Sequence, residues 1–161
     1  MFSSYSVGRR TPLNANPLYG VPMTEATQSG GCYCGLIRYE VTGELGVVAN
    51  CHCRNCRRAH GAAFSTVTLV SGANFRITAG EDAVREYQTG TGSRFSCERC
   101  GGRLFNRAES MPGFTTLSIA TLDREPSEAP QMHINVESKA PWYEILDGLP
   151  QFDGLPTSIP D

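Results

Sequence analysis

The chain contains the stretch CHCRNC at residues 51–56, which places three thiols close together in the sequence. Two further cysteine groups lie on either side of it, CYCG at residues 32–35 and CERCGG at residues 97–102. Together the three groups hold all seven cysteines of the chain. Each group offers two or three sulfurs over a few residues, which a tetrahedral ion with bonds of ~2.3 Å requires. We therefore predict that the cysteines bind metal and that the metal ties distant segments into one fold.

Glycine follows Cys34 and Cys100 in these groups. A tight turn around a metal needs a position with positive φ, and bare backbone N–H groups beside it can point at the thiolates. Free cysteines also occur as core residues, but core packing does not produce pairs of closely spaced sulfurs beside glycines. An iron–sulfur cluster held by four cysteines would leave the remaining thiols without a ligand role. We therefore expect two Zn²⁺ ions per chain, with the seven ligands divided as four and three.

Spacing alone leaves two ways of dividing the cysteines between two ions. One division makes a ribbon-like site from Cys53, Cys56, Cys97 and Cys100 and leaves Cys32, Cys34 and Cys51. The other makes a site from Cys32, Cys34, Cys97 and Cys100 and leaves Cys51, Cys53 and Cys56. We favour the second, because three closely spaced sulfurs can cap one face of an ion without help. A four-cysteine site is saturated, whereas a three-cysteine site keeps an open position, which is typical of catalytic zinc.

The composition indicates one globular domain with no bias toward charged partners. The chain has 161 residues, of which 40% are hydrophobic and 19% are charged, so it can bury a core. The formal net charge of −2 gives no electrostatic reason to bind nucleic acid or an anionic membrane. No stretch approaches the ~20 apolar residues that a membrane helix needs. The 17 Gly and 10 Pro indicate many turns and few long helices.

We expect a flexible tail at residues 1–28, a zinc-binding domain at residues 29–153 and a second tail at residues 154–161. Arg9 and Arg10, with no acidic residue before Glu25, weakly resemble a mitochondrial transit peptide. Several prolines and the lack of amphipathic periodicity favour a disordered tail instead. No secretory apolar region precedes the cysteines, and their odd number argues against a disulfide framework. We therefore expect a cytoplasmic protein.

Short runs rich in β-branched and aromatic residues, separated by turns, predict a mainly β protein of short antiparallel strands. The expected strands lie at residues 36–41, 47–49, 64–70, 74–78, 84–88, 93–97, 114–120 and 132–136. Residues 53–60 could form a short helix ended by Gly61, and residues 141–146 could form one helical turn. The predicted fold is a single zinc-stapled domain with the cysteines in turns between strands.

Histidines and two aromatic residues are further candidates for the site. His52 and His60 could supply a fourth metal ligand, but we expect them to be exposed or hydrogen-bonding groups. His133 lies in an expected strand, where a hydrogen-bonded structural histidine is the simpler interpretation. Trp142 and Tyr143 are expected to fill a small core rather than to stack on a ligand.

Taken together, the motifs resemble those of the glutathione-dependent formaldehyde-activating enzyme family, which also includes centromere protein V. The matching motifs are GCYCG at residues 31–35, CHCRNC at 51–56 and CERCGG at 97–102, with Leu104-Phe105 after the last. The C-terminal part is also similar, through His133-Ile134, SKAPWY at 138–143 and LPQF at 149–152. The resemblance runs from about Gly30 to Phe152 and leaves out the two tails.

The resemblance implies a mainly β fold stapled by zinc, and it implies a role for each cysteine. It assigns the structural ion to Cys32, Cys34, Cys97 and Cys100, and the catalytic ion to Cys51, Cys53 and Cys56. The implied activity is that of a carbon–sulfur lyase, in which glutathione adds to formaldehyde to give S-(hydroxymethyl)glutathione. A small thiol and an aldehyde are therefore the expected partners, with glutathione and formaldehyde or a related aldehyde as the pair.

Three arginines follow the middle cysteines, and two further functions compete with the enzyme. Arg54, Arg57 and Arg58 could steer anionic glutathione, although we expect each to face solvent and to balance the thiolates. A zinc-stapled module that binds protein or nucleic acid is the main alternative, and a redox or metal-reservoir protein is another. The absence of a basic run counts against nucleic acid. The odd ligand count favours the enzyme.

Overall fold

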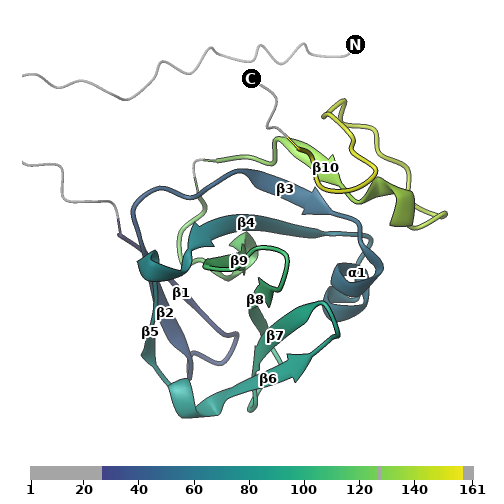
Figure 1. The fold of residues 1–161 in the computed structure, drawn as a ribbon. Helices are drawn as coiled ribbons and strands as arrows, with labels where there is room; N and C mark the ends of the chain where they lie inside the picture. The colour runs from purple at the N-terminus through teal and green to yellow at the C-terminus, as the bar shows by residue number, and fades with distance from the viewer. Residues whose placement is uncertain (1–26, 127, 158–161) are drawn as a thin grey trace, which may run out of the picture.

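The computed structural model describes residues 27–126 and 128–157, and within them the protein is mainly β (Figure 1). The strands are β1 (Thr27–Gly31), β2 (Arg38–Thr42), β3 (Val48–Cys51), β4 (Ser65–Ser71), β5 (Phe75–Ala79), β6 (Val84–Gln88), β7 (Gly92–Cys97), β8 (Arg103–Ala108), β9 (Phe114–Ser118) and β10 (Met132–Ile134). The α-helix in the described part of the chain is α1 (Arg54–His60). Single turns of 3-10 helix lie at Gly72–Asn74, Glu81–Ala83, Ile119–Thr121 and Val136–Ser138. The predicted fold class is confirmed.

The strands form two sheets. The smaller is antiparallel, in the order β1-β2-β5, and the larger runs in the order β10-β3-β4-β9-β8-β7-β6. Neighbouring strands of the larger sheet are antiparallel, except that β10 pairs with β3 in parallel, with Ile134 opposite Cys51. A parallel partner must arrive through a long connection. Here β10 follows β3 in the sheet but comes about 80 residues later in the chain, so the C-terminal part covers the edge beside β3 (Figure 1).

One core joins the two sheets. Tyr39 and Val41 of β2, two residues apart as one face of a strand requires, are both buried. They belong to the same buried cluster as Leu104 of β8 and Leu117 of β9. Burying each large apolar side chain of this kind contributes roughly 1.5–3 kcal/mol to the free energy of folding. The cluster therefore stabilises the packing of one sheet against the other.

A series of aromatic contacts crosses the same interface. Phe75 of β5 lies 5.3 Å from Tyr39 and 4.7 Å from Phe105 between ring centroids, and Phe105 stacks on Phe95 at 4.4 Å. Phe75 belongs to the smaller sheet, whereas Phe95 and Phe105 belong to the larger one. The aromatic residues therefore fix the position of one sheet against the other.

The helix predicted at residues 53–60 is present as α1. The Cys53 sulfur caps it by accepting from the Cys56 backbone N–H, and Gly61 ends it at φ 61°. The helical turn predicted at residues 141–146 is wrong, because this segment contains only a turn at its start. The Tyr143 carbonyl accepts a hydrogen bond from the Lys139 ammonium group at 2.5 Å, where a helix would have a backbone N–H as the donor.

The two predicted tails lie partly outside the described residues. The first tail falls almost entirely on residues 1–26, and β1 begins directly after them. At the other end the backbone carbonyl of Gly154 accepts from Asn135 at 3.1 Å, and residues 158–161 lie outside the description. The boundaries of the zinc-binding domain stay predictions. In the part of the chain that is described, no helix combines the length and apolarity needed to cross a bilayer.

Candidate metal centres

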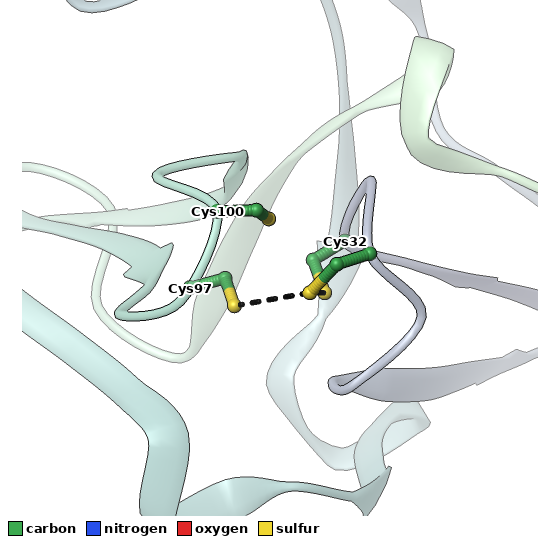
Figure 2. A group of neighbouring side chains, drawn as sticks. Cys32, Cys97 and Cys100 are labelled. Carbon is green, nitrogen blue, oxygen red and sulfur yellow. Dashed lines mark hydrogen bonds between the residues drawn. The ribbon is translucent and has the colours of Figure 1, made fainter.

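The first candidate centre joins the two sheets. Cys32 and Cys34 lie in the turn between β1 and β2, while Cys97 ends β7 and Cys100 lies in the turn before β8. All four Sγ atoms lie within 4.8 Å of one another, and the labelled side chains converge from the two turns (Figure 2). The sulfurs of Cys32 and Cys34 are 3.6 Å apart, and those of Cys34 and Cys97 are 3.9 Å apart. Tetrahedral bonds of ~2.3 Å place sulfurs about 3.8 Å apart, so this group fits a metal ion.

Backbone N–H groups favour the thiolate form at this centre. Ile37 donates its N–H to Cys32 Sγ at 3.3 Å. A hydrogen bond from the Gly102 backbone is the largest cause that lowers the pKa of Cys100, to about 6. The glycines predicted to turn the chain have positive φ, 76° at Gly35 and 68° at Gly101. Because all seven cysteines are free, no disulfide competes with metal binding.

The second candidate centre lies between β3 and α1. Cys51 ends β3, Cys53 caps α1 and Cys56 lies in its first turn, and their three sulfurs lie within 4.8 Å of one another. Cys51 and Cys56 are 6% and 7% exposed, whereas the first centre combines buried Cys32 and Cys97 with exposed Cys34. The pKa of Cys53 is lowered to about 2, mainly because the Cys51 and Cys56 thiols donate to its sulfur.

Each sulfur of the second centre accepts from one N–H donor. The Cys56 backbone donates to Cys53 Sγ at 3.3 Å, as the helix cap requires. The Asn135 side chain donates to Cys51 Sγ at 3.4 Å, and Arg94 Nη1 lies 4.0 Å from Cys56 Sγ. Donors at every sulfur favour thiolates and suit a metal site, whose ligands are usually held by such outer contacts. The residues present therefore fit a metal ion here as well.

Asn135 and Arg94 are functional candidates that sequence reasoning missed. Asn135 follows β10 and has φ 57°, which makes it the one described residue other than glycine with a positive φ. Asn tolerates this conformation better than most residues, so the sequence offers a weak local signal. Arg94 lies in the middle of β7 and offers none.

His52 faces away from the cysteines that flank it and joins a buried chain of hydrogen bonds. Its Nε2 lies 2.8 Å from Nδ1 of His133, whose Nε2 lies 2.9 Å from Oδ2 of Asp147. Both histidines are fully buried. Burial, followed by the charge of His133, lowers the pKa of His52, so the imidazole is neutral at pH 7. The predictions that His52 forms hydrogen bonds and that His133 is a structural histidine are confirmed.

Of the remaining candidate residues, two make contacts inside the domain and one is exposed to solvent. His60 Nε2 lies 3.1 Å from Ser65 Oγ, as expected of a hydrogen-bonding group. Tyr143 is partly buried, and its ring packs against His52 and Phe64, 5.9 and 5.4 Å away between centroids. The predicted packing role of Trp142 is wrong, because its side chain is 72% exposed. Pro141 and Glu144, its near neighbours, are exposed too, so this part of the loop projects from the domain.

The three arginines of α1 differ in exposure. Arg54 and Arg58 are exposed, as expected. Arg57 is partly buried, and its Nη1 donates to the Ser138 carbonyl at 2.6 Å. The three side chains and Trp142 line a surface pocket of about 490 Å³.

The fold and the two cysteine groups define a small, mainly β protein with two candidate metal centres. A sequence model of the family described as glutathione-dependent formaldehyde-activating enzyme matches residues 27–138. The chain belongs to this family. A crystal structure of a Rhodobacter sphaeroides protein is similar to it, with a TM-score of 0.54 and 25% sequence identity. That match covers 63% of this chain and 97% of the other.

Proposed function

We propose that this protein is a zinc-dependent carbon–sulfur lyase that joins a thiol to an aldehyde and reverses the reaction. Glutathione and formaldehyde, or a related aldehyde, are the proposed substrates, and the family description supports both. The observation that carries the proposal is the contrast between four converging sulfurs in one centre and three in the other. Three thiolates leave a tetrahedral ion one position for a substrate.

We assign two Zn²⁺ ions to the chain. The structural ion is assigned to Cys32, Cys34, Cys97 and Cys100, and the reactive ion is assigned to Cys51, Cys53 and Cys56. Thiolate-only ligand sets favour zinc among the common divalent ions. Bound in the three-cysteine centre, Zn²⁺ would supply Lewis acidity, which lowers the pKa of a thiol that ligates it.

The chain's own residues have two tasks in this reaction. Asn135 and Arg94 donate to two of the sulfurs and so withdraw negative charge from the ligands. Burial of Cys51 and Cys56 limits the access of water to the centre. In the reaction the thiol sulfur bonds to the carbonyl carbon and the π electron pair moves to the carbonyl oxygen. The thiol proton ends on that oxygen, so no other reactant is consumed.

We also propose that the protein works in the cytoplasm and without a nucleic-acid partner. Seven free cysteines suit a reducing compartment. The net charge of −2 provides no general attraction for phosphate backbones.

The test is an exchange measurement on the full chain purified without chelator. Metal analysis should find two zinc ions per chain, and NMR should detect exchange between formaldehyde and its glutathione adduct above the background rate. Protein that has lost its weaker-bound zinc should lose the exchange and remain folded. If exchange stays at background with formaldehyde and with a panel of other aldehydes, the enzyme proposal is wrong. Binding of a macromolecule by such inactive protein would then favour the zinc-stapled module.

A further inference from the structure

A second pocket, of about 320 Å³, lies between α1 and the strands β6, β7 and β8. Among the residues that line it are Arg58, Tyr87, Thr89, Arg94 and Arg103. Three of its lining residues are arginines and none is acidic. The pocket therefore concentrates positive charge without an internal counter-ion.

Two of these arginines are held in place by one neutral group. Arg94 and Arg103 both donate to Oδ1 of Asn106, at 3.2 and 3.1 Å. Among the described residues neither pairs with a carboxylate, and the buried Nε of Arg103 has no hydrogen-bond partner. Burial, followed by the charge of Arg94, lowers the pKa of Arg103. An anion in the pocket would offset the repulsion between Arg94 and Arg103.

The pocket adjoins the three-cysteine centre through Arg94. The same Nη1 atom that donates to Asn106 lies 4.0 Å from Cys56 Sγ. An anionic group bound by the arginines and a sulfur near the cysteines could therefore belong to one small molecule.

The pocket beside Trp142 is a weaker candidate for the same role. Its Arg57 donates to the Ser138 carbonyl, and its Arg58 also lines the second pocket. Among the described residues, none of the side chains that line it hydrogen-bonds to a cysteine sulfur, whereas Arg94 of the second pocket contacts Cys56 Sγ.

We propose that the pocket lined by Arg58, Arg94 and Arg103 binds a carboxylate of the thiol substrate. This inference rests on the proposed function, because it takes the substrate to be a thiol that carries a carboxylate, as glutathione does. Guanidinium groups bind carboxylates through paired, charge-assisted hydrogen bonds. The pocket would hold an acidic thiol with its sulfur toward the cysteines and would discriminate against neutral or cationic thiols.

The test measures binding rather than catalysis. The probe is S-methylglutathione, whose sulfur has no proton to lose, titrated calorimetrically into the zinc-loaded full chain. Arg103→Gln should weaken binding roughly tenfold or more, because a charged hydrogen-bond donor is lost. Arg58→Gln should weaken binding less, because Arg58 is exposed on α1. This variant still tests the pocket if Arg103→Gln does not fold. The matched control is Arg76→Gln, because Arg76 lies on β5 of the other sheet and pairs with Glu40.

Two further arms identify the anion. The diester of S-methylglutathione should bind wild-type protein weakly, and Arg103→Gln should weaken it no further. Inorganic phosphate should compete poorly. The inference is overturned if both pocket variants bind S-methylglutathione as wild type does, if the diester binds as tightly as the acid, or if phosphate binds more tightly.

The same measurements separate this inference from the proposed function. Binding of S-methylglutathione that depends on Arg103, together with aldehyde exchange at background, would support the pocket and refute the lyase. Catalysed exchange with unchanged binding in both pocket variants would support the lyase and refute the pocket.

Discussion

The two cysteine centres are built in opposite ways. The four-cysteine centre joins two turns that lie more than 60 residues apart in the chain and belong to different sheets, whereas the three-cysteine centre uses one short stretch. In the four-cysteine centre, backbone groups of the same short loops contact sulfurs, as Ile37 contacts Cys32. In the three-cysteine centre, side chains from β7 and from the segment after β10 reach the sulfurs.

Solvent exposure of the cysteines does not tell which centre is structural and which is reactive. Each centre has two buried cysteines, Cys32 and Cys97 in one and Cys51 and Cys56 in the other, and the four-cysteine centre also has the exposed Cys34. A structural ion can lie near solvent because its ligands fill every position. A reactive ion benefits from a buried setting, where each charge and dipole around it acts more strongly. The number of sulfurs and the origin of their donors therefore indicate function better than exposure does.

The largest effect is expected from breaking the four-cysteine centre. Cys97→Ser removes a proposed ligand between the two sheets, and a structural zinc site contributes on the order of 10 kcal/mol of folding free energy. The variant should unfold at a much lower temperature or fail to fold, as followed by circular dichroism. A thermal midpoint equal to that of wild type would show that Cys97 is no metal ligand.

The corresponding substitution in the three-cysteine centre should abolish the proposed activity without unfolding the domain. Cys53→Ser removes one of three ligands, and two thiolates hold Zn²⁺ poorly. We expect a folded protein with one zinc per chain and no catalysed exchange between formaldehyde and its glutathione adduct. Metal analysis, circular dichroism and NMR exchange provide the three measurements. Two bound zinc ions with full activity would contradict the assignment of Cys53.

A smaller loss is expected from the buried histidines behind the three-cysteine centre. His133→Leu places an apolar side chain at this position and leaves both ring nitrogens of His52 without a protein partner. An unsatisfied buried polar group costs about 1–3 kcal/mol, which urea unfolding should detect. Asp147→Asn is the milder companion, because it keeps a hydrogen-bonding group on a half-exposed side chain. Equal stability of His133→Leu and wild type would show that the chain of hydrogen bonds adds nothing.

The smallest effect on stability is expected at Asn135, where the change concerns metal affinity. Asn135→Gly removes the donor to Cys51 and keeps the positive φ without strain. The zinc of the three-cysteine centre should bind about tenfold more weakly, while the unfolding free energy measured with that centre emptied of metal should stay within ~0.5 kcal/mol of wild type. Competition with a coloured chelator measures this affinity.

A companion variant separates the donor from the backbone. Asn135→Ala also removes the donor but must adopt a left-handed conformation that costs roughly 1–2 kcal/mol. It should match the glycine variant in zinc affinity and fall below it in stability. Unchanged zinc affinity in both variants would show that the contact with Cys51 Sγ has no role in holding the metal.

Much of the sheet could be predicted because burial produces a repeating pattern in the sequence. β6 lies where Val84 to Gln88 was expected, and β4 differs by one residue at each end. β1 was missed because TQSGG has no apolar periodicity, and its place comes from pairing with β2, with Gly30 opposite Tyr39. β8 was missed because its two large apolar residues, Leu104 and Phe105, are adjacent and do not alternate.

The part of the candidate site that could be predicted is the part encoded by closely spaced residues in the sequence. Cysteine spacing was enough to propose the two groups that the structure brings together. Asn135 reaches Cys51 because β10 pairs with β3, whereas Arg94 reaches Cys56 from β7, which is not a neighbour of β3 in the sheet. No local pattern encodes such a contact, since it depends on how strands distant in the sequence are paired.

The parallel pairing of β10 with β3 has a consequence for the order in which the protein is made. Synthesis proceeds from the N-terminus, so every residue of the four-cysteine centre has emerged once Cys100 and its glycines are free. The three-cysteine centre has its ligands much earlier, but it still lacks Asn135 and the strand that covers β3. That strand in turn pairs with Gln151 near the end of the chain. A nascent chain can therefore complete the four-cysteine centre first, and the surroundings of the three-cysteine centre are complete only when the residues around Gln151 have emerged.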